Sequence, residues 1–241
     1  MKTFQELQEG IQDPNIFKAF FLAGGPGSGK SFIVKKGAGI GRGGGLAGLK
    51  KVNSDDVFEK YLKDAGLELD MTTKKAEEEE EERDVLRHRA KEVTTKRRDN
   101  YVDGRLGLII DGTGKDYSKI VDQANDLRRI GYDCYMIYVN TSLDVALERN
   151  RNRERKVHDS IAIKSWKSVQ ANLGPFSQHF KNKFMVVDNN DKDDAELEKA
   201  LLSVGRQISS LLKNKVTNPT AKQWVMQQMK ERGITRMPKG F

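Results

Sequence analysis

The chain has a single cysteine among its 241 residues, Cys134, which lies in the apolar and aromatic run YDCYMIYV. One cysteine excludes a disulfide within the chain and a metal site built from cysteine thiolates. A reducing cytosol is the simplest compartment for such a protein. We therefore expect a cytoplasmic location.

Long apolar runs are also missing. No stretch approaches the roughly 20 apolar residues that a membrane-spanning helix needs. The N-terminal stretch MKTFQELQEGIQDPNIFK is polar throughout and does not resemble a signal peptide. We expect a soluble protein without a membrane partner.

Basic residues outnumber acidic ones, with 43 Lys and Arg against 35 Asp and Glu, so the net charge is +8. This balance favours polyanionic partners, and both phosphate substrates and nucleic acid satisfy it. The length suits one α/β domain with an appendage. The oligomeric state stays open.

Short apolar runs alternate with helical patterns along the chain. The runs predict strands at 18–24, 49–55, 105–111, 132–139 and 183–188. The helical patterns lie at 29–36, 55–65, 73–102, 116–130, 142–155 and 159–172. This alternation predicts an α/β fold of the P-loop kinase type, with a parallel sheet of about five strands and helices on both faces. Ligand loops are expected at the carboxyl ends of the strands.

We predict a P-loop kinase domain over 1–215 and a basic, helical C-terminal extension over 216–241. The domain contains a charged helical insert at 72–102, whose six consecutive glutamates (77–82) are typical of a solvated helix face. Whether this acidic run is ordered stays open.

Two further segments stand out. The glycine-rich tract at 37–48, which contains Arg42, is either a flexible connector or a loop on the substrate side. In the extension, Asn218 and Pro219 suit a helix cap and first helical position, and Trp224, Val225 and Met229 form a candidate docking stripe, which we expect to pack on the domain.

The stretch GGPGSGKS (24–31) matches G-x-x-x-x-G-K-[ST] without a mismatch. Glycines allow the positive φ values that turn backbone N–H groups toward phosphate oxygens, Lys30 can bridge the β- and γ-phosphates, and the Ser31 hydroxyl can bind Mg²⁺. An ordinary glycine-rich turn is the alternative. We predict ATP and Mg²⁺ as cofactors, with a nucleotide site formed by Gly25, Pro26, Gly27, Ser28, Gly29, Lys30, Ser31 and Phe32.

Carboxylates follow two of the predicted strands at the edge where ligands bind. Asp55 and Asp56 begin a helix, so one of them is a candidate general base and one a candidate N-cap. Asp111 and Thr113 follow the apolar run LGLII, where a carboxylate typically orients the metal or its waters. A turn-forming Asp-Gly is the alternative for Asp111. We expect Asp111 beside Ser31 at the metal, and Asp56, Asp111 and Thr113 on the substrate side.

Four arginines alternate along ALERNRNRERKV (146–157). On a helix, Arg149 would share one face with Arg153, and Arg151 would share another with Arg155. Guanidinium groups brought in by a closing lid commonly stabilise the charge of a transferring phosphoryl group. We expect one or two of the four to act this way.

The set GGPGSGKS, NSDD, IIDGTGKD and RNRNRERKV resembles the phosphate-loop kinases that group polynucleotide kinase with the zeta-toxin-like kinases, over roughly residues 18–190. The resemblance implies that Asp55 is the general base and that Arg149 and Arg153 are the lid arginines. Polynucleotide kinases also place an arginine shortly after the acidic pair. Here Val57 or Phe58 stands there, so the resemblance does not give the mode of substrate anchoring, which stays open.

These features predict a kinase that transfers the γ-phosphoryl of ATP to a hydroxyl of a nucleic acid or nucleotide-like acceptor. The basic charge favours a polynucleotide 5′-hydroxyl or a hydroxymethylated base in DNA, the latter a substrate of related phage kinases. Two alternatives stay open: a zeta-toxin-like kinase of a nucleotide-activated amino sugar, and a nucleic-acid-associated ATPase or scaffold without kinase activity.

Overall fold

The computed structural model describes residues 10–37, 48–190 and 194–241. Its strands are β1 (Lys18–Ala23), β2 (Lys50–Val52), β3 (Leu108–Asp111), β4 (Asp133–Asn140) and β5 (Phe184–Asp188). They form one sheet in the order β2-β3-β1-β4-β5, and every neighbouring pair is parallel. The predicted parallel α/β sheet is confirmed. Strand β1 lies at its centre, so the loop that follows it opens at the middle of the carboxyl edge.

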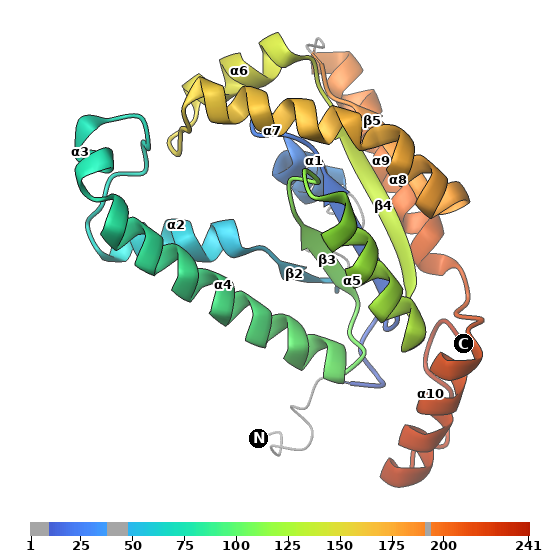
Figure 1. Cartoon of the computed structure of the whole chain (residues 1–241). Coiled ribbons are helices and arrows are strands. Elements are labelled where there is room, and N and C mark those ends of the chain that lie inside the picture. Colours follow the sequence, from blue (N-terminus) through green and yellow to red (C-terminus); the bar gives the residue numbers. More distant parts are fainter. Residues whose placement is uncertain (1–9, 38–47, 191–193) are drawn as a thin grey trace.

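Helices connect and cover the strands (Figure 1). They are α1 (Lys30–Gly37), α2 (Ser54–Asp64), α3 (Lys74–Glu78), α4 (Glu80–Asp103), α5 (Tyr117–Arg129), α6 (Leu143–Asn152), α7 (Asp159–Ala171), α8 (Leu173–Phe180), α9 (Asp194–Lys213) and α10 (Pro219–Arg232), with a short 3-10 helix at Lys181–Lys183. Helices α8 and α9 are absent from the sequence-based prediction. In α9, Val204 and Ile208 are four residues apart and both buried, a helical signal that the sequence does contain.

Two apolar cores hold the layers together. One face of the sheet packs against α5, α7, α8 and α10, through buried residues such as Leu127, Val169 and Phe176. The other face packs against α1 and α9, through Ile33 and Ile208. Because both faces are covered, the middle of β4 is buried from Cys134 to Val139. Its buried thiol is inaccessible, and burial raises the pKa of Cys134 to about 12.

The charged insert departs from the prediction of a wholly solvated helix. Its glutamates 77–82 are mostly exposed, as expected, and all of them except Glu79, which separates α3 from α4, are helical. However, Ala90 and Leu86 of α4 pack on Phe58 and Leu62 of α2, so the insert and α2 share a small core of their own. We call residues 54–103 the α2–α4 lobe; in Figure 1 it extends to one side of the sheet.

A buried arginine joins the start of α4 to the loop between α2 and α3. Arg83 is 1% exposed, and its guanidinium donates to the carbonyl oxygen of Glu68 at 2.8 Å and to the Glu79 carboxylate at 2.9 Å. A buried charge is tolerated only when it is paired and hydrogen-bonded. This pairing explains why a segment with so few apolar residues still folds against α2.

The C-terminal segment begins as the sequence predicts. Asn218 caps α10 by accepting from the Thr220 amide at 2.9 Å, and Pro219 occupies the first turn. Val225 is buried, and Trp224 and Met229 pack against the core on the α5 side. The docking stripe is therefore confirmed.

Most of the glycine-rich tract lies outside the described residues; only its end residues Gly37 and Gly48 are described. Arg42 lies outside the described residues as well. Among the helices of the described segments, none combines the length and the apolar character that crossing a membrane requires.

Candidate active site

The phosphate loop, residues 24–29, is fastened to the ends of neighbouring strands. The Gly24 amide donates to the carbonyl oxygen of Thr113 beyond β3, at 2.9 Å. The Ser28 carbonyl oxygen accepts from the side-chain amide of Asn189 just after β5, at 2.7 Å. These bonds hold the loop at the carboxyl edge of the sheet, where parallel α/β folds bind their ligands.

Close packing against α6 requires a glycine within this loop. Gly27 has a φ of +76°, and a Cβ atom there would lie 2.0 Å from the carbonyl oxygen of Ala146. No side chain fits this space, and positive φ is strained for residues other than glycine. Glycine at position 27 is therefore a steric requirement here.

Lys30 begins α1 and reaches back over the loop. Its Nζ donates to the carbonyl oxygens of Gly24 at 2.6 Å and Gly25 at 3.3 Å. Burial lowers the pKa of Lys30, whereas the nearby carboxylates of Asp111 and Asp55 raise it. The ammonium group is thus positioned where the phosphates of a nucleotide would lie.

The predicted pair for the metal comes together. Ser31 Oγ donates to Asp111 Oδ2 at 3.4 Å, and the Asp111 side chain is only 4% exposed. Burial raises the pKa of Asp111, and the ammonium groups of Lys30 and Lys51 oppose this shift. A hydroxyl and a carboxylate are oxygen donors of the kind that Mg²⁺ prefers, and this ion usually keeps several waters and binds one or two protein groups. Ser31 and Asp111 fit such a site, and no cluster of three or more His, Cys, Asp or Glu in the described part of the chain offers another.

Asp55 and Asp56 lie in the first turn of α2, but neither caps the helix. The N-cap is Asn53, whose side-chain oxygen accepts from the Asp55 amide at 2.8 Å. The N-cap alternative for the acidic pair is therefore wrong, because the helix begins one residue earlier than predicted. Asn53 also donates to Asp111 at 2.9 Å and to Asp56 at 3.1 Å, so it links the two acidic positions.

The two aspartates have different partners. Asp56 pairs with Lys51 of β2 at 2.6 Å. Asp55 faces the guanidinium of Arg155, with contacts of 3.3 Å to Oδ1 and 3.1 Å to Oδ2. Asp55 is therefore the carboxylate of the pair that contacts one of the four arginines.

The four arginines do not all lie on one helix, because α6 ends at Asn152. Arg153, the next residue, is extended, with φ −92° and ψ 158°. Arg149 donates to the carbonyl oxygen of Asn189, just after β5, at 2.7 Å. Arg151 pairs with Asp159 on the surface. The pairing of faces inferred from i, i+4 spacing is wrong.

Arg153 and Arg155 turn toward the site. Burial and the neighbouring Arg155 lower the pKa of Arg153, and the carboxylates of Asp55 and Glu59 raise it. Its Nε is buried without a hydrogen-bond partner among the described residues. A donor held ready in this way suits an anionic ligand.

The arginine-rich segment, residues 153–158, also contacts the α2–α4 lobe. The Met71 amide donates to the carbonyl oxygen of Lys156 at 3.1 Å, and Lys156 pairs with Asp70 at 3.4 Å. Figure 1 shows the connection between α6 and α7 reaching toward the loop beside α3. Together, these segments close one side of the site.

A cavity of about 340 Å³ opens between α4 and the connection from β3 to α5. It includes Asp111 and Thr113 from the predicted site. Three more predicted residues belong to the loop or to α1. Gly25 and Pro26 of the loop lie beside Trp166 and in a half-buried position, respectively, and Phe32 of α1 is exposed.

Three residues of the site are absent from the sequence-based prediction: Lys51, Asn53 and Asn189. Arg155 is among the four candidate arginines of the sequence, although the resemblance implies Arg149 and Arg153 as the lid arginines. For Asn53 a signal exists, since Asn before an acidic first turn is a typical N-cap. Lys51 and Asn189 contribute from elements that are far apart in the sequence, and nothing local marks them.

The sequence profile of a family described as an AAA domain matches residues 20–176, more than half of the chain. The chain belongs to this AAA domain family. The matched region contains the phosphate loop, the acidic pair, Asp111 and the arginines, and the α2–α4 lobe is an internal part of it.

Solved structures similar to this AAA domain protein include kinases. A candidate kinase from Chloroflexus aurantiacus J-10-fl has a TM-score of 0.50 and 15% identity, covering 81% of this chain and 98% of that one. Shikimate kinase from Bacteroides thetaiotaomicron has a TM-score of 0.48 and 13% identity, with 80% and 98% covered. The AvrRxo1-ORF1:ORF2 complex with ATP has a TM-score of 0.47 and 13% identity, with 78% and 64% covered. No curated protein sequence matches this chain. The fold is that of a kinase-like P-loop NTPase, which implies nucleotide binding.

Proposed function

We propose that this protein is an ATP- and Mg²⁺-dependent kinase that transfers the γ-phosphoryl group to a hydroxyl of a nucleic acid or nucleotide-like acceptor. The proposal follows the resemblance to polynucleotide kinase and the zeta-toxin-like kinases. One observation carries it: Ser31, directly after Lys30, contacts Asp111 at 3.4 Å, and Asn53 links Asp111 to the start of α2, where Asp55 contacts Arg155 at 3.1 Å. The Asp111 and Asp55 carboxylates also raise the pKa of Lys30. A cation for phosphates, two carboxylates and a guanidinium group therefore lie around one site.

Each group has a role in this reaction. Lys30 and the loop amides bind the phosphates, and Ser31 and Asp111 hold the Mg²⁺, which supplies charge neutralisation at the phosphates. Asp55 accepts the proton of the acceptor hydroxyl. Arg153 stabilises the equatorial oxygens of the transferring group.

The bonds balance as in other phosphoryl transfers. The acceptor oxygen forms a bond to the γ-phosphorus, while the bond from this phosphorus to the β–γ bridging oxygen breaks and ADP leaves. The hydroxyl proton moves to Asp55. Both Asp55 oxygens face Arg155, so the base acts once this pair opens, and Arg155 is then free to contact the phosphoryl group.

The test is transfer from γ-labelled ATP to several acceptors in parallel: DNA and RNA with 5′-hydroxyl ends, DNA with hydroxymethylated bases, and nucleotide-activated amino sugars. We expect labelled product with a nucleic acid and its loss in Asp55→Asn. Asp64→Asn, at the exposed end of the same helix α2, is the matched control and should retain activity.

Other outcomes would redirect the proposal. Label found only on nucleotide sugars would favour the zeta-toxin-like reaction. ATP hydrolysis without transfer to any acceptor would contradict the kinase proposal and favour the ATPase.

A further inference from the structure

We propose that the cavity between α4 and α5 is the acceptor site, and that it recognises a phosphate group on a nucleotide through cations of both helices. This inference rests on the proposed function and deepens it, because it names the chemistry that selects the acceptor. It also assigns a task to the charged insert, which the reaction described above does not use.

The cavity adjoins the reacting centre. Asp111, which contacts Ser31 at 3.4 Å, lines it, and so does Thr113, whose carbonyl oxygen accepts from the Gly24 amide of the phosphate loop. A molecule in the cavity would therefore have one end beside the metal carboxylate. Ser54, which directly precedes the proposed base Asp55, also lines the cavity, so this end of the molecule would lie on the side of the site where the hydroxyl must be positioned.

One face of α4 forms the opposite wall. The lining residues Lys91, Thr94, Thr95 and Arg98 are spaced by three, one and three positions, which places them on a single side of a helix. Thr94 is buried and its hydroxyl donates to the carbonyl oxygen of Ala90 at 2.7 Å. The two cations of this face remain exposed or half-exposed at the cavity.

Helix α5 and the residues before it supply two more cations, Lys115 and Lys119. The lining carboxylates are Asp111 and Asp116, and Asp116 caps α5 by accepting from the Lys119 amide at 3.1 Å. Arg98 of α4 also pairs with Asp99 at 2.9 Å. Four cationic side chains thus outnumber three carboxylates: Asp99 is paired with Arg98, Asp116 is the cap and Asp111 faces the metal position. The surplus favours an anionic group, and phosphate is the anion that every nucleotide acceptor carries.

The volume favours a single nucleotide. A cavity of about 340 Å³ lies near the lower end of the range of roughly 300–1,000 Å³ for small-molecule sites. A mononucleotide or the terminal nucleotide of a single strand would fill it. The rest of a strand would lie outside, along the exposed cations.

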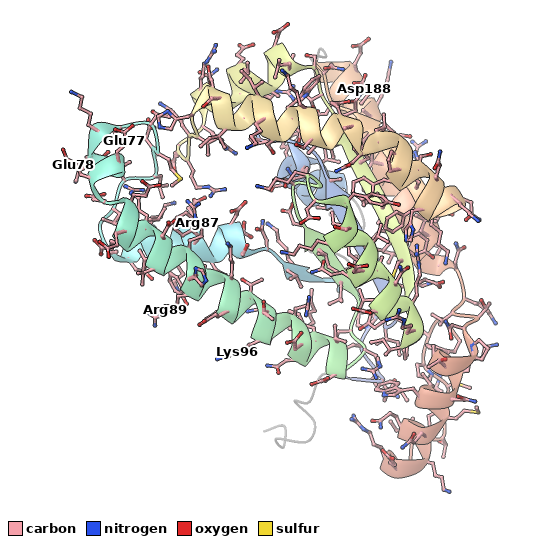
Figure 2. All side chains as sticks on the ribbon, in the orientation of Figure 1. Glu77, Glu78, Arg87, Arg89, Lys96 and Asp188 are labelled. Carbon is pink, nitrogen blue, oxygen red and sulfur yellow. The ribbon has the colours of Figure 1, made fainter. Side chains whose placement is uncertain are left out.

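Arg89 and Lys96 of α4 provide a matched control, because they do not line the cavity. Figure 2 shows them projecting from α4 on the side away from the sheet. The test compares two double variants. The cavity variant carries Lys91→Gln and Arg98→Gln, and the control variant carries Arg89→Gln and Lys96→Gln. Both remove two charges from the same helix. Calorimetry with the full chain saturated with Mg²⁺ and ADP measures binding of thymidine 3′-monophosphate, thymidine and a single-stranded 5′-hydroxyl oligothymidylate.

We expect the cavity variant to bind thymidine 3′-monophosphate at least about tenfold more weakly, since hydrogen bonds to charged groups are among the stronger ones. The control variant should change this affinity less than about twofold, and thymidine should bind weakly to all three proteins. A response seen only with the oligonucleotide would support the site and identify a strand as the source of the phosphate.

Equal affinities of the two variants, or equal binding of thymidine and its phosphate, would overturn the acceptor site. The kinase proposal fails separately. If no acceptor is labelled but nucleotide binding still depends on the cavity cations, the site stands without the reaction. If label is transferred but binding ignores these cations, the reaction stands and the acceptor binds elsewhere.

Discussion

Replacing Gly27 by alanine tests whether the phosphate loop works through the packing seen here. The new Cβ would meet the carbonyl oxygen of Ala146 at 2.0 Å, and the residue would keep a φ of +76°. Left-handed backbone costs a residue other than glycine about 1–2 kcal/mol. Overpacking adds about 1–3 kcal/mol, so we expect a loss of about 2–5 kcal/mol in the free energy of unfolding.

Gly66 offers a control that separates strain from overlap. Its φ is +72°, but a Cβ atom there meets nothing within 4 Å. Gly66→Ala should therefore cost only the backbone strain of about 1–2 kcal/mol. For a chain of this size, 1 kcal/mol corresponds to a Tm shift of about 2–4 °C, so Gly27→Ala should unfold at the lower temperature.

Thermal unfolding with and without Mg²⁺ and ATP gives the decisive reading. Nucleotide at about 100 times its Kd stabilises the native state by about 2.7 kcal/mol. The wild type and Gly66→Ala should show this rise in Tm, whereas Gly27→Ala should lose most of it because the loop must move away from α6. Equal Tm values and equal nucleotide shifts in the two variants would refute the argument.

Three further predictions concern the reacting groups. Lys30→Ala should reduce transfer by about three orders of magnitude or more. Its Tm should change little, because Nζ contacts only the loop carbonyls of Gly24 and Gly25 among the hydrogen bonds described. Near-normal turnover would contradict this role. Asp55→Asn should lower kcat by ~10²–10⁴. Asp56→Asn removes an exposed ion pair worth about 1 kcal/mol or less, so it should affect mainly the free energy of unfolding. Equal losses of kcat in the two variants would contradict these separate roles. Asn53→Ala should lower the free energy of unfolding by about 1 kcal/mol through the lost N-cap and also weaken Mg²⁺ binding, as titration calorimetry would show; unchanged Mg²⁺ affinity would separate the cap from the metal site.

Much of this molecule is determined by local sequence. The five apolar runs predict the strands because buried parallel strands need continuous apolar residues. The phosphate loop is also local, since its glycines, Lys30 and Ser31 are consecutive in the chain. The meeting of Ser31 with Asp111 follows from the rule that parallel strands present their carboxyl ends at one edge.

Tertiary structure decided what depends on where helices end and what they pack against. Helix α6 stops at Asn152, and this end separates Arg149, which is held at Asn189, from Arg155, which reaches Asp55. The alternating arginines look equivalent in the sequence because their side chains are identical. The acidic and basic insert likewise reads as solvated, since only the contact of α4 with Phe58 and Leu62 reveals its apolar face. Charge and spacing are local properties of the chain. The partner of a charge can instead lie a hundred or more positions away, as for Arg155 with Asp55 and Lys18 with Asp133, and the folded chain alone brings these residues together.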